Sequence, residues 1–171
     1  AFIISLSSIL FLKNKKYVIY FLVIGILFLA LAPTFVPQEY INRFISSFDL
    51  EHNKSNITRL NLWHGALLIY QDYYVNGIGL NNFSDLIHKE PYLQQPIVSD
   101  AHAHNIFLQL AAETGTVGLV AFVLLFALII KSLYNYYQLA KNKNLKLFFL
   151  GTLGVIISYL SHGLTEYNLP D

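Results

Sequence analysis

The sequence predicts an all-α polytopic membrane protein, and three observations point to that fold class. Hydrophobic residues make up 55% of the chain, and the mean hydropathy is +0.49. Charged residues make up only 12%, whereas a soluble domain usually carries about 25%. Residues 17–36 also form an uncharged run long enough to cross a bilayer as a helix, which takes about 20 residues. We therefore expect a transmembrane helix bundle.

Four segments are candidate membrane spans. Residues 1–12 are apolar without an initiator Met or a signal-peptide pattern, so we expect them to be the end of a span and residues 1–171 to be one membrane domain of a longer chain. Residues 17–36 form a complete span. Uncharged stretches at 114–130 and 147–164 predict two more, the first belonging to a helix that we expect over 104–130.

The basic residues predict the orientation of these spans. Seven of the eleven lie in two short segments and are Lys13, Lys15, Lys16, Lys131, Lys141, Lys143 and Lys146. The positive-inside rule places both segments, including the loop 131–146, in the cytoplasm. Residues 37–103 then form a large loop on the opposite, external face of the membrane, and chemistry is expected on that face. A net charge of +1 gives no indication of a nucleic-acid partner.

The large loop is expected to be partly helical. Ser55 is a candidate N-cap for a helix with one face formed by Arg59, Trp63, Ala66 and Tyr70,. Gly77 follows Asn76 in a turn signal, and Gly79 permits a second tight conformation. Four tyrosines of the loop could stack on sugar rings, namely Tyr70, Tyr73, Tyr74 and Tyr92.

The strongest chemical feature is His104, which runs directly into an apolar segment. If a helix starts near His104, this residue shares a stripe with Ala111, Gly115 and Gly118,. Small residues at such positions let another helix approach closely, so the stripe predicts that His104 points into the bundle. Imidazole suits proton removal near neutral pH. The alternative is an interfacial histidine satisfied by water or a backbone carbonyl.

Two further readings concern other polar residues. His102 and His104 could bind a metal with Asp100 as a third ligand, although the chain offers no other ligand cluster and no cysteine,. His162 and Glu166 lie four residues apart at the end of the last span. They are either partners of the site or, as the simpler interpretation, a polar pair at a helix end.

These residues resemble the O-antigen ligase family. His104-Asn105, nine residues and then Gly115-x-x-Gly118 match the family's His-[Asn/Ser/Gln]-x9-Gly-x-x-[Gly/Thr/Tyr] pattern. Arg59-x3-Trp63-x2-Ala66, leading to the Gly77-Ile-Gly79-Leu-Asn-Asn-Phe83 stretch, is similar to the family's large periplasmic loop. The resemblance covers about residues 40–130, and the order of spans and loops agrees with it.

The resemblance implies a membrane glycosyltransferase of the O-antigen ligase or polymerase type. Such enzymes move a glycan from undecaprenyl diphosphate to an acceptor hydroxyl on a lipid, glycan or protein, without a nucleotide sugar, a required metal or another cofactor. Negative charge grows on the departing diphosphate, and we expect Arg59, with Arg43 second, to neutralise it. His104 is expected to be the general base, with Asn105 orienting the acceptor or the imidazole.

Two other classes remain as alternatives. A polysaccharide or lipid transporter would carry charges along a path within its spans, and the predicted spans hold none except Glu113 at a boundary. A non-catalytic subunit of an envelope glycan assembly complex would tolerate substitution of His104 and the arginines.

Overall fold

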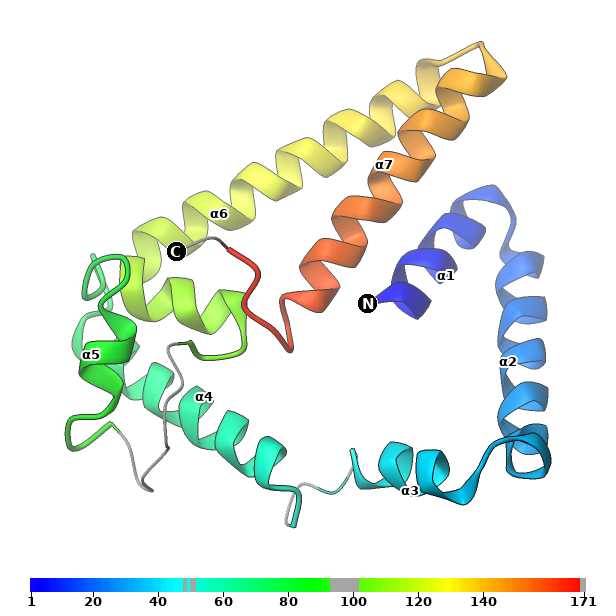
Figure 1. The fold of residues 1–171 in the computed structure, drawn as a ribbon. Coiled ribbons are helices and arrows are strands. Elements are labelled where there is room, and N and C mark those ends of the chain that lie inside the picture. Colours follow the sequence, from blue (N-terminus) through cyan, green and yellow to red (C-terminus); the bar gives the residue numbers. More distant parts are fainter. Residues whose placement is uncertain (48, 50–51, 93–101, 170–171) are drawn as a thin grey trace.

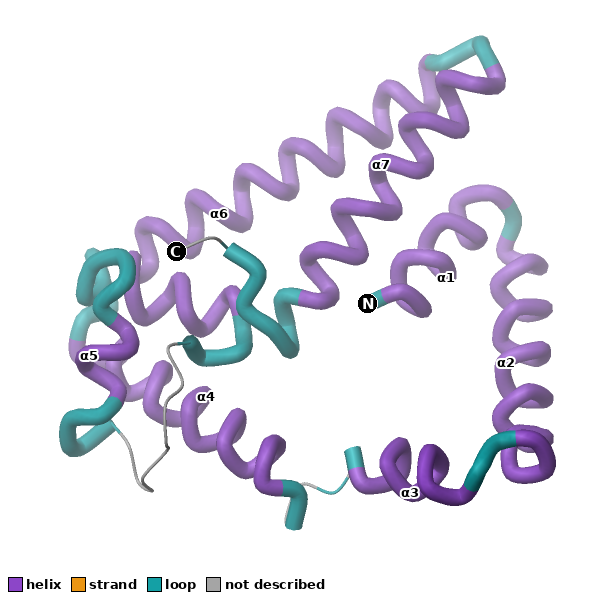
Figure 2. The backbone as a smooth tube through the Cα atoms, viewed as in Figure 1, coloured by secondary structure: helices purple, strands orange, loops and turns teal. Residues whose placement is uncertain are grey.

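The structure, a computed structural model, describes residues 1–47, 49, 52–92 and 102–169. These residues form helices and loops without a strand, which confirms the all-α prediction (Figure 2). The helices are α1 (Phe2–Lys13), α2 (Lys15–Phe35), α3 (Gln38–Ser46), α4 (Lys54–Asp72), α5 (Phe83–Ile87), α6 (Ile106–Leu139) and α7 (Lys143–His162).

Three of these helices, α2, α6 and α7, are long and apolar enough to cross a membrane. They contain or overlap the three complete spans that the sequence predicts at 17–36, 114–130 and 147–164. The shorter α1 is apolar over Ile3–Leu12. Many apolar side chains of α2 and α6 are exposed, among them Phe28 of α2 and Leu124 of α6. Such surfaces are compatible with a lipid solvent and not with water.

Helices α2, α1, α7 and α6 pack as neighbours in that order (Figure 1). Between α1 and α7, the Ser5 hydroxyl donates to the Gly154 carbonyl at 2.7 Å. A Cβ at Gly154 would collide with the Ile9 side chain, so the glycine allows α1 to approach closely. The α1–α2 and α6–α7 turns lie at the same end of this group (Figure 1), and most of the lysines lie in or beside them.

A second unit of packing joins α4, α5 and the start of α6. Its fully buried side chains include Leu62, Ile69, Phe83 and Ile87. Residues of three separate elements thus share one apolar core, which fixes α4 against α6. The N-cap of α4 is Asn53, whose side chain accepts from the Ser55 amide. The predicted cap, Ser55, is wrong by two residues because both side chains can cap a helix and Asn53 lies where the chain leaves the extended conformation.

Helix α6 is broken at Gly115, which has φ 64 and ψ −164. A helix interruption frees backbone donors and acceptors that need other partners. The turn after α4 supplies them: the Ile78 and Gly79 amides donate to the Ala112 and Glu113 carbonyls at 3.0 and 2.8 Å. In the other direction, the Thr116 amide donates to the Tyr74 carbonyl at 2.7 Å.

Both glycines at this crossing are required by the close approach. A Cβ at Gly77 (φ 68) would collide with the Glu113 backbone, and one at Gly115 would collide with the Val75 backbone. The predicted turn at Gly77 is therefore present, and Gly79 also has a positive φ of 91. Gly115 meets a loop, whereas the sequence stripe predicted a neighbouring helix. At Gly118 a Cβ would instead collide with the Thr114 side chain of the same helix.

Candidate functional site

His104 lies two residues before α6, not within it. Its φ of 48 is left-handed, a conformation that costs free energy for a residue with a side chain and that concentrates at functional sites. The preceding Ala103 is fully buried, and its amide donates to the Gln109 side chain at 2.7 Å. The helical stripe that the sequence suggested for His104 is thus wrong, since the helix starts later and breaks at Gly115.

The Asn105 side chain hydrogen-bonds both the first turn of α6 and the segment that follows α7. Its Oδ1 accepts from the amides of Phe107 and Leu108 at 3.0 and 3.1 Å, which caps α6. Its Nδ2 donates to the Leu164 carbonyl at 3.0 Å, and the Ile106 amide donates to the Gly163 carbonyl at 2.7 Å. The end of α7 is therefore bound to the start of α6, and the residues after α7 are brought beside His104.

Glu166, in the segment after α7, is in contact with His104. Its Oε1 lies 2.6 Å from His104 Nδ1, and its Oε2 lies 3.4 Å from an Arg59 terminal nitrogen. The three side chains come from α4, the start of α6 and the segment after α7. Each is about one-third exposed, at 34% for Arg59, 28% for His104 and 35% for Glu166. The cluster is thus partly open to a ligand.

The Glu166 carboxyl is ionised under ordinary conditions. Its burial opposes ionisation, but the hydrogen bond and charge of His104, the Tyr167 amide and Arg59 together outweigh that effect and hold its pKa below the ordinary value of 4.5. A carboxylate can only accept hydrogen bonds. His104 therefore donates from Nδ1, and such an imidazole in its neutral form carries its lone pair on Nε2.

Arg59 reaches this cluster from the helix face that the sequence predicted. On the same face, Tyr70 lies 2.7 Å from the Thr116 hydroxyl beyond the α6 break. The ion pair between Arg59 and Glu166 is long and partly solvated, so it adds little to stability. Arginine has five N–H donors, and this one contact leaves others for an anionic ligand.

Trp63 lies one helical turn after Arg59. Its buried Nε1 has no hydrogen-bond partner among the described residues.

The structure does not bring Arg43 to this cluster. Arg43 is exposed on α3, and it makes no side-chain hydrogen bond or ion pair within the described part of the chain. The His102 ring stacks on the ring of Tyr167, with centroids 4.5 Å apart. Asp100, the third member of the metal hypothesis, lies outside the described residues. Among the described ones, no three His, Asp or Glu side chains group as metal ligands.

The simpler interpretation of His162 and Glu166 is wrong. His162 Nδ1 lies 2.7 Å from the Asn168 side-chain nitrogen, while Glu166 turns to His104 and Arg59. Helix α7 ends at His162, so Glu166 lies beyond the helix and the spacing of four residues does not pair the two side chains. The sequence could single out Glu166 as a carboxylate just after a span, but its spacing from other residues could not predict that it contacts His104.

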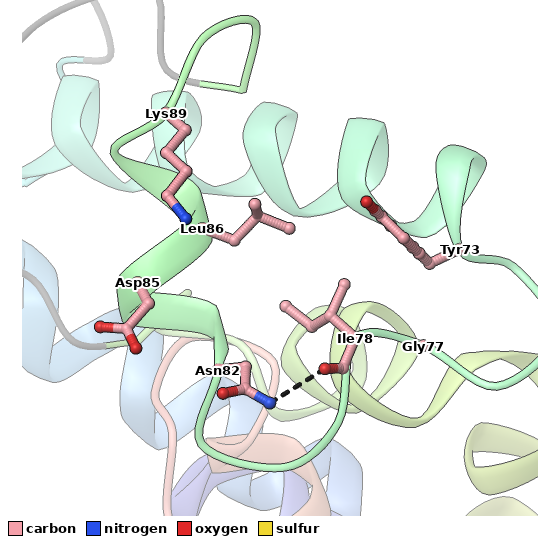
Figure 3. Close-up of a pocket in the computed structure, with 7 residues that line it drawn as sticks. All are labelled: Tyr73, Gly77, Ile78, Asn82, Asp85, Leu86 and Lys89. Atoms are coloured by element: carbon pink, nitrogen blue, oxygen red, sulfur yellow. Dashed lines mark hydrogen bonds between the residues drawn. The ribbon is translucent and has the colours of Figure 1, made fainter.

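A polar pocket of about 430 Å³ opens beside the turn at Gly77 (Figure 3). Its lining comes from the end of α4, the turn and α5, and comprises Tyr73, Gly77, Ile78, Asn82, Asp85, Leu86 and Lys89. Asn82 donates to the Ile78 carbonyl at 3.0 Å and so closes the turn. Of the four tyrosines considered for sugar contact, Tyr73 lines this pocket, whereas Tyr92 is buried and donates to Asp72 at 2.9 Å.

The family model of the O-antigen ligases matches residues 1–123. The chain belongs to the O-antigen ligase family. The part that matches the O-antigen ligase model contains Arg59 and the His104-Asn105 motif, and Glu166 lies after that part. Membership implies a glycosyltransferase-like membrane enzyme that handles a glycan-linked lipid. No curated protein matches the chain significantly.

Proposed function

We propose that this chain carries the catalytic centre of a membrane glycosyltransferase that moves a glycan from undecaprenyl diphosphate to an acceptor hydroxyl. The acceptor is a lipid, a growing glycan or a protein, as in an O-antigen ligase or polymerase. The observation that carries the proposal is the cluster of Arg59, His104 and Glu166, which joins a phosphate-binding group, a base and an orienting carboxylate.

His104 acts as the general base. Glu166 accepts the Nδ1 proton and fixes the ring, so the neutral imidazole presents Nε2 to the acceptor hydroxyl,. As the hydroxyl oxygen attacks the anomeric carbon, its proton passes to Nε2. The imidazolium that forms is stabilised by the ionised Glu166, in the same way that a buried aspartate supports histidine in hydrolytic triads.

Arg59 binds the leaving diphosphate. The bond between the anomeric carbon and the phosphate oxygen breaks, and negative charge accumulates on that oxygen. A guanidinium contacts two phosphate oxygens at once, which suits Arg59 better than a lysine. This role falls to Arg59 alone, because Arg59 contacts the cluster whereas Arg43 is exposed on α3 without such a contact. Asn105 contributes by capping α6 directly after His104.

The site belongs, in this proposal, on the periplasmic face of a bacterial inner membrane. In this proposal the lysines beside the α1–α2 and α6–α7 turns mark the cytoplasmic end of the helices. The contact between His104 and Glu166 lies at the other ends of α6 and α7, since His104 precedes α6 and Glu166 follows α7. No metal and no cofactor take part in this reaction scheme, because the base and the charge-neutralising group are both side chains.

A double-mutant comparison in the full-length protein tests this function. Glycan transfer from a polyprenyl diphosphate donor is measured for His104→Ala, Glu166→Gln and the double variant. If His104 and Glu166 act as one unit, the double variant loses hardly more activity than His104→Ala alone. Losses that multiply would mean independent roles. Transfer at the wild-type rate in all three variants would contradict the proposed catalytic function. That result is what the transporter and assembly-subunit alternatives predict.

A further inference from the structure

Helix α3 separates its residues completely by polarity. At 100° per residue, Tyr40, Phe44, Ile41 and Ile45 fall within one arc of about 140°. The polar residues fall within the opposite arc and are Gln38, Asn42, Ser46, Glu39 and Arg43. On the polar side, Gln38 donates to Asn42 at 3.2 Å. A short helix with such separation is built to lie at a boundary between an apolar and a polar medium.

Most of the apolar arc of α3 is exposed at the surface of the described part of the chain. None of the nine residues of α3 is buried. The exposed fractions are 60% for Tyr40, 56% for Phe44 and 61% for Ile45. Together these side chains make a contiguous apolar surface in a segment with no extensive packing on α4 or α6. A surface of this kind marks an interaction site.

The position of α3 identifies the partner. Helix α2, a candidate span, ends at Phe35, and extended residues at Val36 and Pro37 separate it from the first turn of α3. Helix α3 then runs across the direction of α2 (Figure 1). A helix that follows a span immediately and turns aside from its axis lies at the level of the lipid head groups.

An apolar pocket of about 340 Å³ joins the two helices. Its lining comprises Leu29, Ala32 and Pro33 of α2, Val36 directly after it, and Tyr40, Ile41 and Phe44 of α3. The apolar arc of α3 is therefore continuous with the lipid-facing surface of α2. The pocket has the chemistry of a hydrocarbon chain, and the polar arc beyond it places Arg43 where lipid phosphates lie.

We propose that α3 is an interfacial helix that binds the bilayer leaflet at the carboxyl end of α2, with its apolar arc among the acyl chains and one chain in the pocket between α2 and α3. Arg43 then contacts a lipid phosphate and not the reacting diphosphate. This assignment is independent of the proposed glycan transfer, since it concerns only how the segment between α2 and α4 is held at the membrane.

Two single-cysteine variants of the full-length protein test the proposal, and this chain contributes no native cysteine. Phe44→Cys places an environment-sensitive fluorophore on the apolar arc, and Ser46→Cys places it about 160° away on the polar arc. Each labelled protein is reconstituted into phosphatidylethanolamine and phosphatidylglycerol vesicles with brominated acyl chains. Quenching by the bromine atoms and by aqueous iodide is then measured without added substrate.

The proposal requires severalfold stronger bromine quenching at position 44 than at position 46, and the reverse order for iodide. Strong iodide quenching at both positions would place α3 in water. Protection of position 44 from both quenchers would mean that protein covers the arc. Loss of the bromine quenching at position 44 when an unbrominated polyprenyl phosphate is added would assign the pocket to a substrate chain. Each of these three results overturns the assignment to bilayer lipid.

Discussion

Glu166 Oε1 lies 2.6 Å from His104 Nδ1, although the two residues are 62 positions apart in the chain. We expect Glu166→Gln in the full-length protein to lower glycan transfer because an amide can neither fix the Nδ1 tautomer as firmly nor stabilise the imidazolium. Glu166→Asp should recover part of the loss if its shorter carboxylate still reaches the ring. Expression and membrane insertion serve as controls, and unchanged transfer in Glu166→Gln would leave the contact without a catalytic role.

The same residue predicts a pH dependence of stability. The pKa of Glu166 is lowered from 4.5 in the folded protein, so its contribution to folding is present above 4.5 and is lost as pH falls through the lower, folded-state pKa. We expect the difference in thermal stability between wild type and Glu166→Gln to stay constant from neutral pH down to about pH 5 and to shrink below 4.5. A difference that already disappears near neutral pH would contradict the assignment.

His104→Ala is expected to reduce transfer by about 10²- to 10⁴-fold, the usual contribution of positioned acid–base catalysis. His102→Ala should reduce it far less, because His102 stacks on Tyr167. The rate should fall in acid, where a protonated imidazole cannot accept a proton, and should survive EDTA. Equal losses in both variants together with EDTA sensitivity would favour the metal site of Asp100, His102 and His104.

Arg59→Lys should keep the fold and lose most of the transfer, since an ammonium cannot contact two phosphate oxygens in the manner of a guanidinium. Arg43→Lys is the matched control, because Arg43 is exposed on α3 and away from Glu166. The measurement is the initial transfer rate at saturating acceptor. Equal effects of the two substitutions would show that contact with the cluster does not distinguish the arginines.

Gly77→Ala should destabilise the protein by more than about 2 kcal/mol, because the left-handed conformation disfavours a side chain and a Cβ would collide with the Glu113 backbone. Gly115→Ala should behave alike, since it faces the Val75 backbone. Gly151→Ala, where a Cβ meets nothing within 4 Å, is the control and should be neutral or slightly stabilising. Thermal unfolding in detergent compares the three variants.

A reporter inserted between Asn81 and Ser99 should be active in the periplasm, and one between Lys141 and Lys146 in the cytoplasm. The lysines flanking the spans give this orientation. An alkaline phosphatase and a fluorescent protein, each fused at both positions, make the measurement reciprocal. Cytoplasmic fluorescence from the first position would reverse the topology and place the cluster on the wrong side for a periplasmic glycan.

The sequence by itself determined the all-α membrane fold and the approximate places of three spans, and it singled out His104 and Arg59 as candidates for chemistry. Hydrophobic length and charge asymmetry are local properties, because each span satisfies its own backbone and contacts lipid whatever its neighbours do. The motif around His104 and the face of α4 that carries Arg59 were also readable, since helical phase follows from spacing alone.

Tertiary structure alone decided which of these side chains meet. Helical phase could not predict His104, because a left-handed residue precedes the helix and Gly115 interrupts it. That break exists because the turn at Gly77 supplies partners for the freed backbone groups. Glu166 reaches His104 because Asn105 and Ile106 bind the end of α7. Hydrogen bonds between distant segments have no period in the sequence, so only the packed chain reveals them.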